Sequence, residues 1–119
     1  MMNEVMLTQM KNNLADMAAA CNARETQLAM DGRTDESIHA RIERNVYEAI
    51  SAVLHAAANQ SDPEAFFRAR LAQIPANWVA AKETAVAHDD SEKALIESIK
   101  IKAADASAAV LDQRPEGQV

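Results

Sequence analysis

Glu36 and His39 are the first residues in this 119-residue chain whose types and spacing suggest chemistry. Side chains three residues apart share one face of a helix, and carboxylate metal sites in helical bundles are built from Glu-x-x-His pairs. Two such pairs are needed, and neither His55 nor His88 follows an acid by three residues. We therefore predict no metal site, and we interpret His39 as a solvated histidine near a helix start.

His88 and Asp89 suggest a second chemistry, that of a small metal-dependent helical hydrolase. The dipeptide resembles the His-Asp pair of the HD phosphohydrolases, whose metal site also needs an upstream His and a downstream Asp. His55 and Asp105 are the residues available for these roles. The chain has no nucleophile elbow, no His-Glu-x-x-His helix and no pair of cysteines. We expect a non-enzymatic protein with no catalytic residue and no cofactor, and the hydrolase is our third hypothesis.

The segment 63–88 resembles a helix-turn-helix, with a short helix, a corner at 74–76 and a second helix that would enter a major groove. Bases are read mainly by basic and amide side chains, whereas this second helix offers Trp78 and Val79 in its early turns and offsets Lys82 with Glu83. The net charge is -6, and the basic residues form no stripe for a phosphate backbone. A nucleic-acid-associated transcriptional regulator is therefore the alternative interpretation, and we do not expect nucleic acid as a partner.

The composition limits the other possibilities. Alanine accounts for 26 residues, and two Phe, one Tyr and one Trp are the only aromatic residues, so the core must be thin. Two glycines are too few for glycine-rich phosphate loops or dinucleotide-binding folds. The longest uncharged stretch, 49–61, is shorter than the ~20 residues of a membrane helix, and the amino end lacks a secretory signal. We therefore expect no membrane span. Cys21 has no second cysteine with which to form a disulfide, so we expect a cytoplasmic protein.

The elements that must position these residues are all helices. Glycines and prolines occur only where the 3.6-residue periodicity stops, which divides the chain into helical segments. A first helix of ~29 residues would be ~43 Å long, more than the ~35 Å diameter of a compact chain of this length. We therefore expect an all-α, elongated antiparallel bundle of four to five helices, with a single domain over 1–112 and a flexible tail over 113–119.

The first two helices, at about 3–31 and 34–59, are expected to form a helical hairpin. Gly32 is the predicted C-terminal cap of the first helix, and Thr34 is the predicted N-cap of the second. The second helix carries a wide apolar stripe, which predicts a central position with more than one neighbour. The apolar stripes of the two helices set a register with three predicted contacts: Leu28 with Ile38, Cys21 with Val46, and Leu14 with Val53.

Arg24 is the one charged residue in the stripe of the first helix. The register of the hairpin places it beside Glu43, near the end where the turn lies. An unpaired guanidinium in an apolar seam costs several kcal/mol, whereas at the rim it can stay in water and bind a carboxylate. We therefore predict an ion pair between Arg24 and Glu43.

Three shorter segments follow the hairpin. Ser61 is the predicted N-cap of a third helix that ends near residue 73, and Pro75 is expected to force a corner before a fourth helix. Asp89 and Glu92 have the spacing of a capping box, so we expect a kink or joint at 88–92 before the last helix.

The leading functional hypothesis is a non-enzymatic helical protein that self-associates and binds another protein, as an adaptor, regulator or accessory factor. Two heptad-like apolar seams have no evident partner in the sequence, and a thin core gains stability from association. We expect a homodimer. The first-choice interface is the seam of the last helix and the second choice is the methionine-rich end of the first helix: Ile96, Ile99, Ala103, Ala106 and Val110, then Met6 and Met10.

Overall fold

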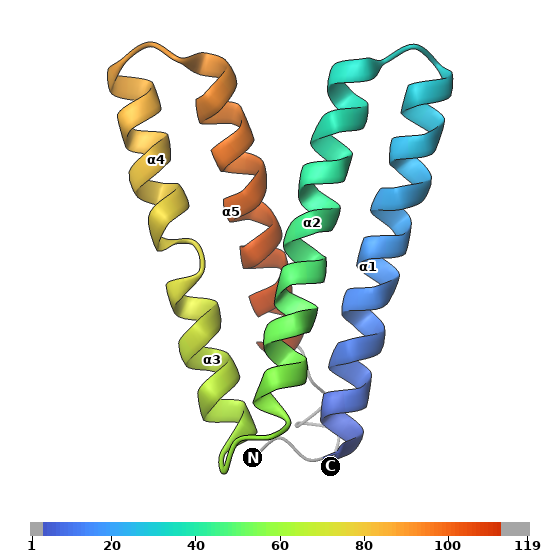
Figure 1. Cartoon of the computed structure of the whole chain (residues 1–119), viewed down its shortest axis with the longest axis vertical. Helices are drawn as coiled ribbons and strands as arrows, with labels where there is room; N and C mark the ends of the chain where they lie inside the picture. The colour runs from blue at the N-terminus through green and yellow to red at the C-terminus, as the bar shows by residue number, and fades with distance from the viewer. Residues whose placement is uncertain (1–3, 113–119) are drawn as a thin grey trace.

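The structure is a computed structural model that describes residues 4–112. The predicted tail at 113–119 lies outside the described residues. The described part is all-α and contains no strand, which confirms the expected fold class. It forms five helices: α1 (Glu4–Met30), α2 (Thr34–Ala57), α3 (Pro63–Gln73), α4 (Ala76–Ala87) and α5 (Ser91–Asp112), shown in Figure 1.

The helices form two arms of a V (Figure 1). One arm is the α1–α2 hairpin and the other is α4 with α5, and α3 lies end to end with α4. The arms meet at the end where α2 passes into α3, and they diverge towards the loops at 31–33 and 88–90. The molecule measures 45 × 34 × 26 Å, and its radius of gyration is 15.8 Å, against roughly 13.5 Å for a compact chain of this length. The expected elongation is confirmed.

The α1–α2 hairpin closes as the sequence predicts. Gly32 adopts a φ of +76°, the left-handed conformation that favours glycine, and its amide donates to the carbonyl oxygen of Ala29 at 3.1 Å. The amide of Arg33 donates to the carbonyl oxygen of Leu28 at 2.9 Å, which completes the C-terminal cap of α1. The chain therefore reverses within three residues and lays α2 back along α1.

The predicted contact between Leu28 and Ile38 stays a prediction, and Ile38 is not part of the buried core. Ile38 is 38% exposed, whereas its neighbour Ser37 is buried and donates its hydroxyl to the carbonyl oxygen of Glu25 on α1 at 3.0 Å. Consecutive residues point about 100° apart around a helix, so Ser37 and Ile38 cannot both face α1. Ala40, which is also buried, lies on the same side as Ser37. Small side chains therefore fill the tip of this arm.

Two predicted caps are displaced by one residue. Thr34 is the first residue of α2 rather than its N-cap, which is Arg33, and no side-chain hydrogen bond caps this helix. At the start of α3 the side chain of Asp62, not that of Ser61, accepts from the backbone amide of Ala65 at 3.1 Å. An Asp carboxylate both caps and complements the positive end of the helix dipole, which favours it over the serine hydroxyl.

Pro75 interrupts the helix but does not force the expected corner. Ile74 and Pro75 both keep helical backbone angles, with φ and ψ of -54° and -47° at Ile74 and of -78° and -7° at Pro75. The missing amide of proline ends α3, yet the backbone angles preserve its direction. Helix α4 therefore continues along the line of α3 (Figure 1). Since α3 and α4 together occupy one position in the bundle, the five helices make a four-helix arrangement.

The joint expected at 88–92 is a complete break. Asp89 adopts a φ of 57°, in the left-handed region that side chains other than glycine rarely adopt. The N-cap of α5 is Asp90 rather than the predicted Asp89, because its carboxylate accepts from the amide of Lys93 at 3.1 Å. Helix α5 then runs back along α4 and makes the second arm.

A buried carboxylate lies on α5. Glu97 is 6% exposed, and one of its oxygens accepts from Nζ of Lys100 at 3.3 Å. The other oxygen, Oε2, is buried and has no hydrogen-bond partner among residues 4–112. Nζ of Lys100 also lies 5.9 Å from the ring centroid of Trp78 on α4, within the range of a cation–π contact. This polar contact is one of the links between α4 and α5.

The bulky core lies where the arms meet. Fully buried side chains there include Leu14 of α1, Ile50 and Leu54 of α2, and Phe67 of α3. Helix α2 contacts α1, α3 and α5, so its predicted central position is confirmed. Alanines fill much of the remaining core. Near the tips of the arms, the buried residues are serine and alanine, with Glu97 as the one larger side chain among the described residues.

Phe67 of α3 is the largest fully buried side chain of the core. We expect Phe67→Ala to lower the free energy of unfolding by about 3–5 kcal/mol, because it leaves a large cavity in a thin core. The neighbouring Phe66→Ala is the matched control, and it should cost less than about 2 kcal/mol since Phe66 is only half-buried. Urea unfolding followed by circular dichroism measures both, and equal losses would contradict this core assignment.

Candidate protein-binding groove

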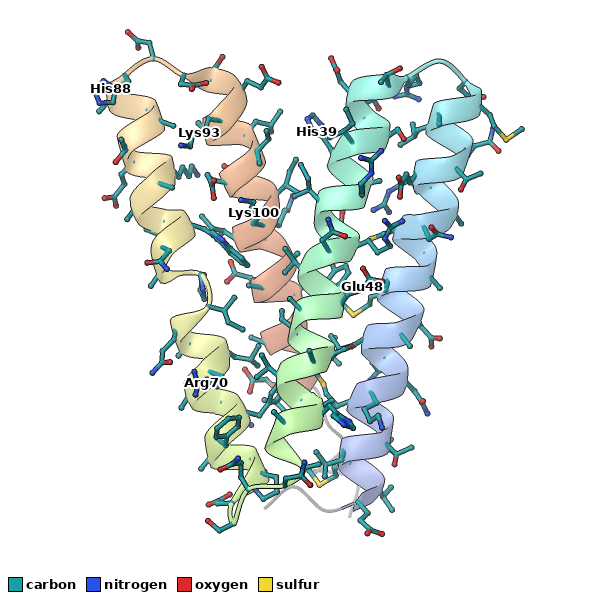
Figure 2. The ribbon with its side chains drawn as sticks, viewed as in Figure 1. His39, Glu48, Arg70, His88, Lys93 and Lys100 are labelled. Atoms are coloured by element: carbon teal, nitrogen blue, oxygen red, sulfur yellow. The ribbon has the colours of Figure 1, made fainter. Side chains whose placement is uncertain are left out.

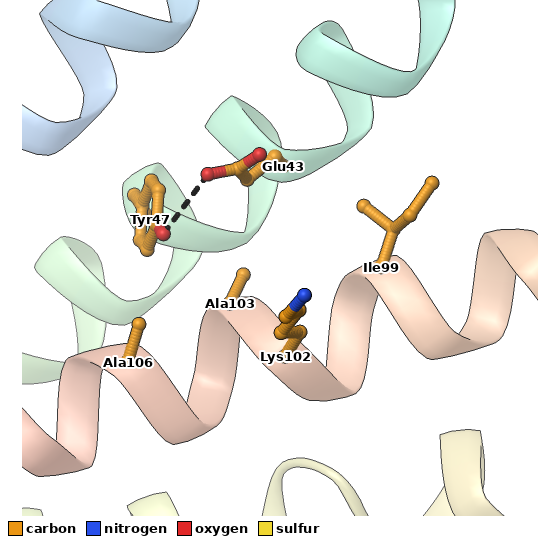
Figure 3. Close-up of a pocket in the computed structure, with 6 residues that line it drawn as sticks. All are labelled: Glu43, Tyr47, Ile99, Lys102, Ala103 and Ala106. Carbon is orange, nitrogen blue, oxygen red and sulfur yellow. Dashed lines mark hydrogen bonds between the residues drawn. The ribbon is translucent and has the colours of Figure 1, made fainter.

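A groove opens along α2 and α5 where the two arms begin to diverge. It consists of two adjoining hollows of about 440 and 500 Å³, which share Glu43 and Ile99. We call the two hollows together the α2–α5 groove. The first, shown in Figure 3, is lined by Glu43, Tyr47, Ile99, Lys102, Ala103 and Ala106. The second adds Arg24, Leu28, Arg33, Glu36, His39 and Ala40.

A polar cluster forms the wall between the two hollows. The Arg24 guanidinium donates to Oε1 of Glu43 at 2.9 Å, which confirms the predicted ion pair. The hydroxyl of Tyr47 donates to Oε2 of the same carboxylate at 3.1 Å (Figure 3), and Arg24 also reaches Sγ of Cys21 at 3.4 Å. Both oxygens of Glu43 therefore accept a hydrogen bond, which fixes the position of this carboxylate in the wall of the groove.

Burial changes the ionisation of two groups in this cluster. Desolvation, followed by the charge of Glu43, raises the pKa of the Cys21 thiol from 9.0 to about 11. The same two causes raise the pKa of Tyr47 above its ordinary value of 10.0. Both side chains are therefore neutral at physiological pH. Since the thiolate and not the thiol is the nucleophile, Cys21 offers no reactive group at that pH.

The α1–α2 wall of the groove is held by ion pairs outside the core. Glu25 of α1 accepts from Nε of Arg41 at 2.9 Å and also binds Arg44, both of which lie on α2. Arg44 donates in addition to the side-chain oxygen of Asn22 at 2.8 Å. The hydrogen bond from Arg41 is the main cause that lowers the pKa of Glu25. These contacts fix the position of α2, and therefore of Glu43 and Tyr47, relative to α1.

Two polar side chains on the groove have no ion pair within the described residues. Lys102 projects from α5 at the rim and is exposed, and His39 lies on the side of α2 that faces the other arm (Figures 2 and 3). In contrast, Arg24 is paired with Glu43, and Arg33 is paired with Glu36. Lys102 is therefore the cation in this groove that is available to a ligand.

The residues expected to form an interface divide into two groups. Met10 and Ala103 are 4% and 2% exposed and pack mainly in the chain's own core, so they offer little area to a second copy of the chain. Ile99 alone of the seven lines both hollows of the groove, and Ala103 and Ala106 lie at its floor. The other five are half-buried: Met6, Ile96, Ile99, Ala106 and Val110. Their role between copies of the chain stays a prediction.

The residues considered for metal chemistry are not brought together. Across residues 4–112, no group of three or more His, Cys, Asp and Glu side chains could hold a metal ion. Glu36 binds Arg33. His88 lies at the tip of the second arm (Figure 2), and Asp105 lies more than about 20 Å farther along α5 at 1.5 Å per residue.

The geometry of a helix-turn-helix is also missing from the described part of the chain. Helices α3 and α4 follow one another in line (Figure 1), whereas that motif needs its second helix to cross the first at roughly 90–120°. The nucleic-acid alternative therefore loses the structural feature that suggested it.

No protein-family model, curated protein or solved structure matches the chain. Within residues 4–112, no helix combines the length and the apolar character that crossing a bilayer requires. The function must therefore be argued from the groove itself. Sequence reasoning missed this groove, although Glu43 and Tyr47 carry a usable signal, since their spacing of four residues lets a carboxylate and a phenol meet on one helix face.

The ionisation of Cys21 gives a test of the cluster. We expect the native thiol to react with iodoacetamide at pH 8 at least ~100-fold more slowly than the thiol in 6 M urea, because a pKa of about 11 in place of 9.0 lowers the thiolate fraction by that factor. The unfolded state also loses its thiol proton first, so stability should fall as pH rises from 9 towards 11.

Cys21→Ala is the control for that pH dependence. It removes the thiol and should reduce the decline in stability between pH 9 and 11, as measured by urea unfolding at each pH, while Tyr47, whose pKa is also raised, maintains the rest of that decline. A native thiol that reacts as fast as the unfolded one would show that Cys21 is not held in the cluster.

Proposed function

We propose that this chain is a non-enzymatic helical module that binds an amphipathic helix of a partner protein in the α2–α5 groove. The observation that carries the proposal is the position of Ile99. It belongs to the apolar seam of the last helix, yet it lines both hollows of the groove and is only half-buried. A second apolar surface laid along the groove would complete its burial.

The dimensions of the groove suit a helix. Its α2 side runs from Glu36 to Tyr47, which is about 16 Å of helix or three turns. A bound amphipathic helix uses contacts at intervals of three and four residues over this length. Small side chains permit the close approach of two helical backbones, and the floor of the groove supplies them at Ala40, Ala103 and Ala106.

The charges of the groove define the partner further. Lys102 stands at the rim without an ion pair among residues 4–112, while Arg24 and Arg33 are already neutralised by neighbouring carboxylates. A complementary helix therefore carries a carboxylate beside its apolar stripe, placed to meet Lys102. Such rim pairs contribute mainly to specificity and to the rate of association, while the apolar floor provides the affinity. A cytoplasmic location, expected from the sequence, is part of the same proposal.

A displayed library of amphipathic helical peptides tests the proposal. Peptides selected on the purified protein should carry an apolar stripe and at least one carboxylate. Their affinity should fall at least ~10-fold on Ile99→Asp, because a carboxylate in the apolar floor must be desolvated. Lys102→Glu should weaken binding by about 3-fold to 10-fold, and more strongly at low salt, since it removes the rim cation. Fluorescence anisotropy with labelled peptides measures these changes.

Val86→Asp is the matched control for that experiment. Val86 lies on α4 and is 59% exposed, and it does not line the groove. The variant should therefore bind the selected peptides as the unaltered protein does. A library that yields no binder, or binders that tolerate Ile99→Asp as well as Val86→Asp, would overturn the proposed function.

A further inference from the structure

The two walls of the α2–α5 groove are parallel helices. The loops at 31–33 and 88–90 form the tips of the two arms, and α2 and α5 both begin there and run towards the base, where the arms meet (Figure 1). In contrast, α1 runs antiparallel to α2, and α4 runs antiparallel to α5. Each wall therefore has an antiparallel neighbour on its outer side, while the groove lies between two helices whose dipoles point the same way.

The two hollows of the groove lie at different distances from the tips. The hollow nearer the tips is lined by Glu36 and His39, which lie in the first two turns of α2. The hollow nearer the base is lined by Tyr47 of α2 and Ala106 of α5. Lys102 lines this second hollow and not the first. The cation that is available to a ligand therefore lies in the half of the groove nearer the base.

Acidic side chains are in excess at the tip end of the groove. Residues 31–37 and 88–94, which make up the tips, include six acidic and two basic residues. Asp35 and Glu92, in the first turns of α2 and α5, are exposed, and neither forms an ion pair with any of residues 4–112. The positive ends of the two helix dipoles, about half a charge each, offset only part of this excess. The groove is therefore negative at its tip end and carries its available cation nearer the base.

A bound helix responds to this polarity through its own two ends. Acidic side chains stabilise a helix near its amino end, and basic side chains stabilise it near its carboxyl end. A helix whose amino end points towards the base therefore brings its acidic half to Lys102 and its basic half to the acidic tips. The opposite direction brings like charges together at both places. The first direction also sets the dipole of the bound helix antiparallel to those of both walls.

We propose that the partner helix binds in one direction, antiparallel to both α2 and α5, with its carboxylates in its amino-terminal half and its basic residues in its carboxyl-terminal half. This inference rests on the proposed function, which defines the occupant of the groove as an amphipathic helix. It adds the direction of that helix and the order of its charges. The bound helix then lies against each wall as α1 lies against α2 and as α4 lies against α5.

Two matched peptides test the order of charges. Both carry the apolar stripe of the strongest binder selected from the library. The first has glutamates in its amino-terminal half and lysines in its carboxyl-terminal half, and the second has these two residue types exchanged. The first should bind at least ~10-fold more tightly, as measured by fluorescence anisotropy at low salt. Lys102→Glu should reduce this preference about 3-fold or more, because it removes the cation that the glutamates meet.

A spin label tests the direction itself. A nitroxide at the amino end of the first peptide should broaden the amide NMR signals of Ala103 and Ala106, which line the hollow nearer the base. A nitroxide at the carboxyl end should instead broaden the signals of His39 and Ala40, nearer the tips. Ile99→Asp should remove both effects, since both require the peptide to bind in the groove.

The outcomes distinguish this inference from the proposed function. Peptides that lose binding on Ile99→Asp, but broaden the two sets of signals in the reverse order or equally from both ends, would overturn the direction and leave the helix-binding groove in place. Equal affinities of the two matched peptides would overturn the proposed order of charges. A library without a binder, or binders that tolerate Ile99→Asp, would overturn the proposed function and this inference together.

Discussion

The uneven distribution of bulky side chains along α2 determines the rest of this structure. At the end where the arms meet, Ile50 and Leu54 pack with Leu14 and Phe67 and exclude water. Towards the tip of the first arm, the only buried side chains of α2 are those of Ser37 and Ala40. The side of α2 that faces the other arm carries Glu36, His39 and Glu43 there, and these polar side chains offer too little apolar area to draw the second arm onto the first. The arms therefore share one core at one end and separate at the other, which opens the α2–α5 groove.

The hairpin was predictable because it depends on local information. A 3.6-residue stripe identifies each helix, and a three-residue turn at Gly32 leaves one register, so the Arg24–Glu43 ion pair could be predicted. The sequence did not predict which of two adjacent residues faces α1 or caps a helix, because that choice depends on which side chain packs or caps better in the folded chain. Ser37 displaced Ile38 from α1, and Asp62 displaced Ser61 as a cap, for this reason.

The groove could not be predicted because it depends on residues far apart in the chain. The apolar stripe of α5 indicates that Ile99 lies either in the core or at an interface. Ile99 lines the groove because the two arms diverge at its position. That divergence depends on which α2 side chains, more than 50 residues earlier, face the second arm. The engagement of both Glu43 oxygens likewise needs Tyr47 from the same helix and Arg24 from another. Hydrophobic periodicity identifies the apolar face of a single helix, but it does not show how closely the faces of two helices pack together.

The two arms differ in how they are held. The α1–α2 arm has ion pairs from Glu25 to two arginines, in addition to the apolar seam. In the α4–α5 arm, the buried Glu97 has one oxygen without a hydrogen-bond partner, a state that costs roughly 1–3 kcal/mol. This arm also exposes Val79 and Val86 to water. The contacts within the α4–α5 arm therefore hold it less firmly than those of the α1–α2 arm, which keep the wall of the groove fixed.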